Sequence, residues 1–409
     1  MVTARVGRTV TPITSLTWAS ALPWQDRQVT RRIVHVSDSY LPGLGGIETQ
    51  IAYLGRQQAA AGNRVGVVTT TPGSPGAHGL SRAVEDGLDV YRIAARIPGG
   101  YPIHLRAGHH VTSALRSARP DVVHLHMGIL APTAQATFRV VRRLELPAVV
   151  TVHSVWGPGQ ERALGLLDRL VRGSRFPVEL ATVSEMAAAP LRRVAGDRAP
   201  IHVLRNGVDV GEWLGEPLPR ERAGVHAVYA ARFAPRKRVL PLLEALRRTR
   251  DLLGSADDGA LHVTIAGEGE ELGKARAFLE ANDMADWVSL PGRLSREELK
   301  SLYRRADVYL APGVLDAFSV ASQEAQAAGL AIVTRSQSGA AELVTHEVEG
   351  LLADDDDAFA AQLARLVREP ALLERIVTQN RTVPPRTAWD AVVGAHDAVY
   401  DLAQQRYAR

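Results

Sequence analysis

The chain has 409 residues, of which 46% are hydrophobic and 22% charged, and its formal net charge at pH 7 is +4. This composition is typical of a soluble globular protein with two or three domains, and it excludes a disordered chain, a collagen-like chain and a coiled coil. Because cysteine is absent, disulfides, thiolate metal sites and a cysteine nucleophile are excluded as well.

The first 31 residues carry scattered arginines and threonines, and their apolar stretches, such as Leu16–Leu22, are short and interrupted. They lack the continuous apolar core of a signal peptide, and no uninterrupted apolar run in the chain approaches the roughly 20 residues that span a bilayer. We therefore expect residues 1–31 to be a loosely ordered extension and the protein to be cytoplasmic. Peripheral contact with the inner face of the membrane stays open as a hypothesis.

From Arg32 onward, short runs rich in β-branched residues alternate with amphipathic stretches, which is the pattern of parallel sheets with crossover helices. In the first half we expect strands at Ile33–Val36, Val65–Thr70, Asp121–Leu125, Ala148–Val152 and Val203–Leu204. Helices are predicted there at Ile47–Ala61, Ala131–Arg143 and Arg162–Arg172.

The second half repeats the pattern, and two of its helix starts carry capping signals. Strands are expected at Ala227–Ala231, His262–Ala266, Val288–Leu290, Val308–Ala311 and Ala331–Thr334. Ser295 and Glu298 form a predicted capping box in front of a helix. The acidic run Asp354–Asp357 is interpreted as an N-cap with dipole compensation rather than a metal site, because an amphipathic helix follows at once. Gly329 is a predicted helix C-cap.

The turn Asn206–Asp209, followed by the Gly- and Pro-containing stretch Gly211–Arg220, marks the predicted domain boundary. We predict two Rossmann-like, doubly wound α/β domains with parallel sheets, residues 32–208 and 209–386. Residues 387–409 are expected to form a helix that packs back across the junction. Two such domains turn the carboxyl ends of their strands toward a shared cleft, where ligands bind.

Three loops at predicted strand ends carry residues suited to a phosphorylated sugar. Gly45 and Gly46 open a helix whose N–H groups could meet a phosphate or sugar hydroxyls; a plain tight turn is the alternative. Arg232 and Lys237 follow the first strand of the second domain and could hold a diphosphate, unless they form a merely solvated basic loop.

The third loop carries two acids with seven residues between them. Asp316 precedes Ala317, Phe318, Ser319 and Val320, a segment expected to open a helix, and Glu324 lies one turn further on. The two carboxylates could bind hydroxyls at two points of one ligand, while the segment's N–H groups meet an anion. The alternative is that Asp316 is an N-cap and Glu324 a solvated helix residue.

Histidines gather at the ends of two predicted strands of the first domain. His124 and His126 lie on one face if their strand continues that far, and His153 ends the next strand. No carboxylate pattern supports a metal site there, so hydrogen-bonded imidazoles are the simpler interpretation. The dispersed basic residues and the 5% aromatic content also disfavour a nucleic-acid groove.

Taken in order, these segments resemble the retaining glycosyltransferases of family 4, which have the GT-B architecture, over nearly the whole chain from about Ile33. The matching motifs are Gly45-Gly46-Ile-Glu48, Asp121-Val-Val-His124-Leu-His126, Asn206-Gly-Val-Asp209, Arg232 with Lys237, Gly267-Glu-Gly269, and Asp316 with Glu324-Ala-Gln-Ala-Ala-Gly329. No single motif is decisive, whereas the ordered set is specific.

The resemblance implies a role for each matching residue. Arg232 and Lys237 would bind the diphosphate of a nucleotide-sugar donor, and Glu324 would bind its ribose. Asp316 would contact the donor sugar's hydroxyls, aided by the backbone N–H groups of Ala317 to Ser319. His126 would lie near the reacting carbon, and Gly45-Gly46 near the phosphate and acceptor. The implied reaction is retaining and requires neither a metal nor another cofactor.

The sequence departs from the family pattern at three places. Asp316 replaces a glutamate, Ala317-Phe318-Ser319 replaces Gly-Phe-Gly, and Ala231 and Arg238 replace glycines. The departures at Asp316 to Ser319 keep one alternative open, a nucleotide-sugar-binding protein that has lost turnover. A second alternative is a nucleotide-sugar epimerase on the same fold, which would use carboxylates in the cleft as acid and base. The acceptor, whether glycan, lipid or small molecule, is not identified by the sequence. The stretch Arg162–Arg175 is a candidate for membrane contact, with a core-facing helix as the alternative.

Overall fold

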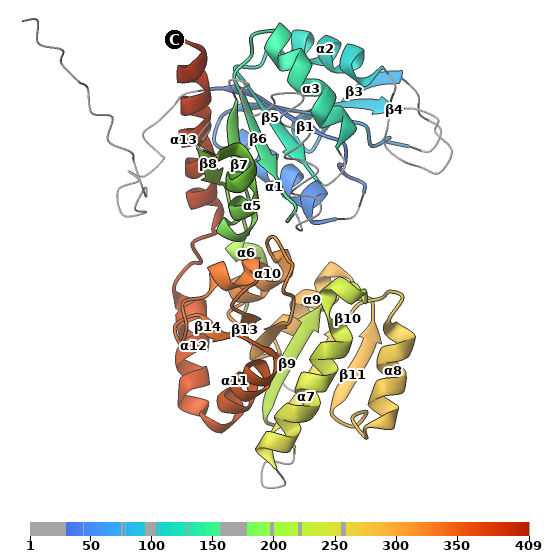
Figure 1. The fold of residues 1–409 in the computed structure, drawn as a ribbon, viewed down its shortest axis with the longest axis vertical. Coiled ribbons are helices and arrows are strands. Elements are labelled where there is room, and N and C mark those ends of the chain that lie inside the picture. Colours follow the sequence, from blue (N-terminus) through green and yellow to red (C-terminus); the bar gives the residue numbers. More distant parts are fainter. Residues whose placement is uncertain are drawn as a thin grey trace, which may run out of the picture.

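Two parallel sheets, each covered by helices, organise the chain into an upper and a lower lobe (Figure 1). The computed structural model describes residues 30–43, 45–74, 77, 79–94, 104, 106–128, 131–155, 178–196, 200–219, 223–254 and 259–408. The candidate helix at Arg162–Arg175 and most of the N-terminal extension lie outside these residues.

In the described part of the upper lobe, eight strands form one sheet in the order β3-β4-β2-β1-β5-β6-β7-β8. The strands are β1 Arg32–Ser37, β2 Arg64–Thr69, β3 Gly79–Glu85, β4 Leu88–Ala94, β5 Val122–Met127, β6 Ala148–Val152, β7 Glu179–Thr182 and β8 Ile201–Val203. The helices are α1 Gly46–Ala60, α2 Ala107–Ala118, α3 Pro132–Arg143 and α5 Glu185–Ala195. The central strands are buried almost throughout, because helices cover both faces.

The lower lobe contains six strands among its described residues, all paired in parallel in the order β11-β10-β9-β12-β13-β14. The strands are β9 Val225–Ala230, β10 Leu261–Ala266, β11 Val288–Gly292, β12 Val308–Ala311, β13 Ala331–Arg335 and β14 Gly350–Ala353. The helices are α7 Val239–Leu253, α8 Leu272–Ala281, α9 Arg296–Tyr303, α10 Val320–Ala327, α11 Asp356–Arg368 and α12 Pro370–Thr382. The predicted fold class of two doubly wound parallel-sheet domains is thus confirmed.

One edge of the upper sheet is antiparallel, which we did not predict from the sequence. β3 pairs antiparallel with β4, and Asp86 and Gly87 connect them with positive φ angles of 49° and 81°. Such a two-residue turn matches the twist of adjacent antiparallel strands. The carboxyl end of the upper sheet, where the candidate residues lie, is unaffected because β3 is the outermost strand.

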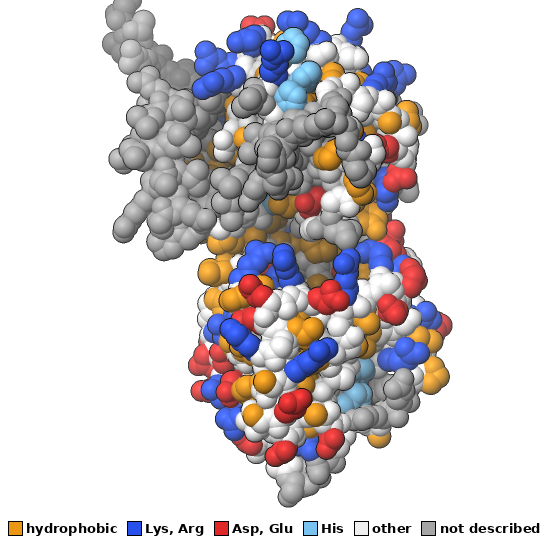
Figure 2. All heavy atoms as spheres, turned by 90° about the vertical axis from the view of Figure 1, so that its right-hand side faces the viewer, with side chains coloured by type: hydrophobic (Ala, Val, Ile, Leu, Met, Phe, Trp, Pro, Cys, Tyr) orange, Lys and Arg blue, Asp and Glu red, His pale blue; other side chains and the backbone are white. Residues whose placement is uncertain are grey.

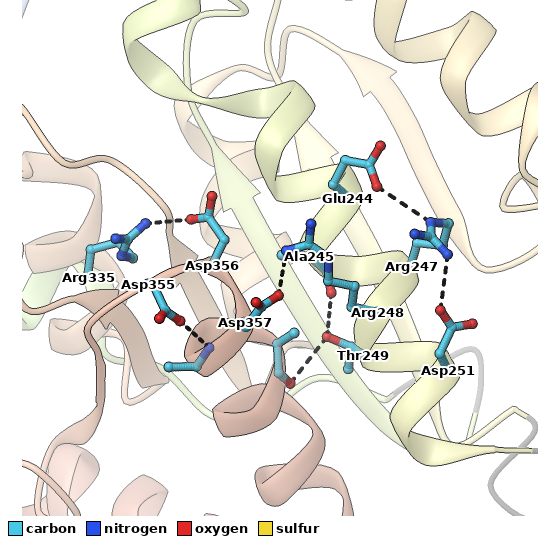
Figure 3. A network of polar contacts seen from close by, with 12 residues as sticks. Glu244, Ala245, Arg247, Arg248, Thr249, Asp251, Arg335, Asp355, Asp356 and Asp357 are labelled. Carbon is cyan, nitrogen blue, oxygen red and sulfur yellow. Dashed lines mark hydrogen bonds and ion pairs between the residues drawn. The ribbon is translucent and has the colours of Figure 1, made fainter.

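The predicted N-terminal caps are present, whereas α10 has its C-cap at Ala328, one residue before the predicted Gly329, which follows with a positive φ of 94°. Ser295 and Glu298 form the capping box of α9, and the Asp355 side chain accepts a hydrogen bond from the Ala358 N–H at the start of α11. Next to that cap, Asp356 receives the guanidinium groups of Arg335 and Arg238. Figure 3 shows Arg335 pointing at Asp356 and, beside it, Arg248 of α7 pointing at Asp357. The acidic run therefore fixes the start of α11 against β13 and α7.

The chain crosses between the lobes twice. The first crossing follows β8 and contains the short helix α6, Val210–Trp213; the second leads into α13, Trp389–Tyr407, which returns to pack against α1 and β6 (Figure 1). At this junction Gly207 exchanges two hydrogen bonds of 3.1 Å with the side chain of Gln50 on α1. A Cβ on Gly207 would lie 2.2 Å from the ring of Trp389, so only glycine fits there.

Candidate active site

A cleft of about 410 Å³ lies between the lobes at the carboxyl ends of the strands. Its walls include the first turn of α1, the end of β6, the loop after β9 and the segment leading into α10. Figure 2 shows Lys and Arg side chains gathered along the edge of the lower lobe that faces the upper lobe. The cleft is the position at which tandem doubly wound domains bind ligands.

The loop after β9 brings a lysine to the cleft. A single 3₁₀ turn, Pro235–Lys237, follows the strand, and the Tyr229 hydroxyl donates to the Lys237 carbonyl at 2.8 Å. The Lys237 ammonium lies 2.6 Å from the Asp316 carboxylate, and both side chains are about one quarter exposed. Arg236 also lines the cleft. Arg232, the other predicted cation, is exposed and does not line the cleft.

The loop after β12 supplies a carboxylate and backbone donors. Asp316, Ala317, Phe318, Ser319 and Val320 all line the cleft. The helix begins later than expected: Ser319 is the N-cap, and its hydroxyl accepts from the Ser322 N–H. The first N–H groups of α10 have no acceptor within the helix, so they favour an anion in the cleft.

Gly339 holds the Asp316 loop in place. Its N–H donates to the Asp316 carbonyl at 2.9 Å, and a Cβ there would lie 2.2 Å from the Ala317 carbonyl oxygen. A side chain at position 339 would therefore push the Asp316 loop away.

The start of α1 faces the start of α10 across the cleft. Gly46, with Ile47 and Glu48, lines the wall, and a Cβ on Gly46 would lie 3.8 Å from the Val320 methyl. Gly45 is the N-cap of α1 but does not line the cleft. Two helix N-termini, one from each lobe, thus converge on the same space.

His124 and His126 lie on one face of β5, as the sequence predicts. The histidine that reaches the cleft, however, is His153. β5 does continue through His126, and the rings of His124 and His126 lie 4.1 Å apart on one face. His126 is only 3% exposed and does not line the cleft, whereas His153 does.

One ring nitrogen from each of His35, His124 and His126 lies within 4.8 Å of the other two, close enough to be considered as a set of metal ligands. All six nitrogens of these rings already have a hydrogen-bond partner. His35 and His126 bond to each other, and the four remaining nitrogens bond to Gln58, Tyr400, Thr151 and His153. A metal ion would have to break several of these bonds, so the arrangement fits a hydrogen-bonded network better than a metal site.

Glu324 lies outside the residues that line the cleft, although it follows Val320 by one turn of α10. Its carboxylate lies 3.3 Å from Arg296, whose guanidinium makes shorter contacts of 2.7 and 2.9 Å with Glu212. Burial raises the pKa of Glu324 to about 7, and the Arg296 charge offsets this rise only in part because Arg296 lies closer to Glu212. Hydrogen bonding to Arg296 lowers the pKa of Glu212 to about 2.

Three polar contacts that the sequence did not suggest connect the lobes near the cleft. Glu342, just after β13, accepts from the Met186 N–H of α5 and pairs with Arg205 at 3.1 Å. Gln323 of α10 donates to the Asn206 carbonyl at 2.8 Å. None of the three belongs to a recognisable motif, because each joins segments more than 100 residues apart in the chain.

Comparison with known proteins identifies the family. A family model described as glycosyl transferases group 1 matches residues 222–383, and one described as Glycosyltransferase Family 4 matches residues 44–212. Glycogen synthase of Mycobacterium tuberculosis is 28% identical over 404 residues, which cover 92% of this chain and 95% of that protein. The chain belongs to the family 4-like GT-B glycosyltransferases.

Solved structures show the same architecture as this glycosyltransferase. A glycosyltransferase from Rickettsia africae superposes with a TM-score of 0.71 at 14% identity, over 91% of this chain and 98% of that chain. HepE of Anabaena in complex with UDP and glucose gives 0.67 at 16% identity, over 90% and 98% of the two chains. Among the described helices of this glycosyltransferase, none has the length and apolar character needed to cross a membrane.

Proposed function

We propose that this glycosyltransferase moves a sugar from a nucleotide diphosphate to an acceptor hydroxyl with retention of anomeric configuration. The observation that carries the proposal is the convergence of Lys237, Arg236 and the start of α10 on the same cleft as Asp316. Two cations and a helix N-terminus suit a diphosphate, and a carboxylate suits sugar hydroxyls.

In the proposed reaction, the bond between the sugar's anomeric carbon and the diphosphate oxygen breaks, and the acceptor oxygen bonds to that carbon on the same face. The acceptor's proton passes to the departing phosphate oxygen. Lys237 and Arg236 stabilise the charge that develops on the diphosphate. Asp316 holds the sugar by its hydroxyls, and closure of the two lobes brings the reactants together. These cations make a metal ion or other cofactor unnecessary in this proposal.

The remaining predicted residues keep proposed roles near this centre. Glu324 binds the ribose hydroxyls by exchanging its contact with Arg296 for the donor. Arg232, exposed on the same loop as Arg236, supports the diphosphate from the outer side. His126 holds, by a hydrogen bond, the ring of His153, which lines the cleft. Gly45 and Gly46 keep the start of α1 open for a phosphate or the acceptor.

The proposal is tested first by donor binding. UDP, GDP and ADP are titrated against the protein by calorimetry, with thermal shift as a second readout, because a bound ligand raises apparent stability. Lys237→Ala should weaken nucleotide diphosphate binding by about 10- to 100-fold, since a charge-assisted hydrogen bond contributes about 1.5–3 kcal/mol. Lys274→Ala, on α8 away from the cleft, is the matched control and should bind as the wild type does.

Turnover distinguishes the proposal from its alternatives. Release of the nucleotide diphosphate that depends on an acceptor, chosen from glycan, lipid and small-molecule panels, supports the transferase. In that assay Lys237→Ala should lower the rate by about 30- to 900-fold, or about 2–4 kcal/mol. Donor binding with no turnover favours the degenerate binding protein, which the changes at Asp316 and Ala317-Phe318-Ser319 motivate. Donor isomerisation without acceptor favours the epimerase, and a product of inverted anomeric configuration refutes retention.

A further inference from the structure

A row of imidazoles connects the interior of the upper lobe with the cleft. His35 on β1 contacts His126 on β5 through Nδ1 and Nε2 at 2.9 Å, and His126 Nδ1 contacts Nε2 of His153 at 3.0 Å. His35 is fully buried and His126 nearly so, whereas His153 is half-buried and lines the cleft. Each contact joins Nδ1 of one ring to Nε2 of the next. In a row of neutral rings, the protons can therefore all lie on Nε2 or all on Nδ1, and the row has one of two directions of donation.

Gln58 on α1 sets that direction. Its amide nitrogen donates to the Tyr400 hydroxyl at 3.0 Å, which turns its carbonyl oxygen toward His35 Nε2 at 2.8 Å. A carbonyl oxygen only accepts, so Nε2 of His35 must carry the proton. Its Nδ1 is then a lone pair that accepts from His126 Nε2, and His126 Nδ1 in turn accepts from His153 Nε2.

A second row of hydrogen bonds keeps the Gln58 amide in this orientation. The Tyr400 hydroxyl, which accepts from Gln58, also lies 2.9 Å from His124 Nδ1 and donates its one proton there. His124 Nε2 then donates to the Thr151 hydroxyl oxygen at 2.7 Å. Turning the Gln58 amide over would require both rows to reverse together.

Burial keeps the row uncharged. It lowers the pKa values of His35 and His153 to about 4 and those of His124 and His126 well below the usual value. The other titratable groups that face the row are His396 and Tyr400 of α13; burial lowers the pKa of His396 to about 4 and raises that of Tyr400. Near neutral pH the rings therefore differ only in which nitrogen holds the proton.

We infer that His35 and Gln58 are positioning residues that hold His153 as the tautomer protonated on Nε2. Nδ1 of His153, which has no partner among the described residues, is then an unprotonated acceptor available to the cleft. A nitrogen lone pair accepts from a hydroxyl and repels a phosphoryl oxygen. This end of the cleft therefore suits a sugar or acceptor hydroxyl rather than the diphosphate, an assignment of ligand that rests on the proposed function.

The tautomer can be measured directly without substrate. Protein labelled with ¹⁵N-histidine is studied at pH 7.5 by two-bond ¹H–¹⁵N correlation, and the His153 signals are those lost in His153→Asn. We expect His153 to carry its proton on Nε2. A proton on Nδ1, or on both nitrogens, overturns the inference. Because no donor is present, this result is independent of whether the protein transfers a sugar.

Variants test whether Gln58 sets the tautomer. Gln58→Met leaves the His35 Nε2 proton without an acceptor, so the row should reverse and the His153 signal should shift toward the Nδ1-protonated form. Gln58→Glu keeps an acceptor and should retain the wild-type signal. Thr137→Val is the matched control, because it removes a buried hydroxyl of α3 whose bond to the Thr133 carbonyl belongs to neither row, and His153 should be unchanged. An unaltered His153 tautomer in Gln58→Met, or an equal change in Thr137→Val, overturns the role of Gln58.

Discussion

The contact between Gly207 and Trp389 allows the substitution Gly207→Ala to be worked through from the structure. An added Cβ would lie 2.2, 2.3 and 2.5 Å from three atoms of the indole ring, whereas real Cβ contacts are essentially never below 3.0 Å. Trp389 is 7% exposed and packs with Leu54, Val392 and Val393, so it has little room to move. Either α13 or the segment that follows β8 must therefore shift.

The expected loss of stability has two parts. Overpacking in a filled core costs about 1–3 kcal/mol. A shift of the Gly207 backbone also weakens its two hydrogen bonds with the buried Gln50 side chain, each of which contributes about 1 kcal/mol. We therefore expect Gly207→Ala to lower the free energy of unfolding by about 3–5 kcal/mol.

Urea unfolding followed by tryptophan fluorescence measures this change, and a second glycine provides the control. Gly394 lies on α13 with no atom within 4 Å of a Cβ added there. Gly394→Ala should therefore stabilise the protein by about 0.5–1 kcal/mol through helix propensity. In a Trp389→Ala background the clash is absent, and Gly207→Ala should cost less by about 1–3 kcal/mol. A Gly207→Ala protein within about 1 kcal/mol of the wild type would refute the reasoning.

Two further predictions concern charged groups of the lower lobe. The pKa of Glu324 is about 7 in the folded protein and 4.5 in the reference state. The protonated Glu324 carboxyl therefore contributes its full share to the free energy of unfolding below pH 4.5, and this contribution is lost as the pH rises through 7. Glu324→Gln should remove this loss. In urea titrations, the free energy of unfolding of the variant should therefore rise relative to that of the wild type between pH 5 and pH 8. If the two proteins give parallel curves of unfolding free energy against pH, burial of Glu324 does not raise its pKa. Asp356→Ala should cost about 2–4 kcal/mol because it strands the buried guanidinium of Arg335. The exposed Asp357→Ala should cost less than about 1 kcal/mol, and equal thermal shifts for the two variants would show that burial does not decide the difference.

The sequence was most informative where burial on both faces of a sheet makes a strand a continuous run of apolar residues. β1, β6 and β12 are such strands, and their predicted positions differ from the observed ones by at most one residue at either end. β3 was missed because its middle residues are exposed and its composition is mixed. The Asp86-Gly87 pair was a usable signal for the β3–β4 hairpin.

The site was predictable where loops at the carboxyl ends of neighbouring strands meet, and less so where the direction of a single side chain decides. Lys237 and Asp316 were singled out separately and lie 2.6 Å apart. Which arginine of the β9 loop lines the cleft depends on the 3₁₀ turn at Pro235–Lys237, and this turn favours Arg236 over Arg232. Likewise the partner of Glu324, Arg296, comes from another helix and has no signature in the local sequence.

The return of α13 to the upper lobe has a consequence for how the protein is made. Val399, Tyr400 and Ala403 complete a core whose other buried members, such as Ile33 and Val149, come from the first half of the chain. The ribosome synthesises the whole lower lobe before these residues. The core of the upper lobe, although most of it is synthesised first, is therefore completed last. A chain truncated near residue 208 would leave a hydrophobic face of the upper sheet exposed to solvent and should aggregate during expression.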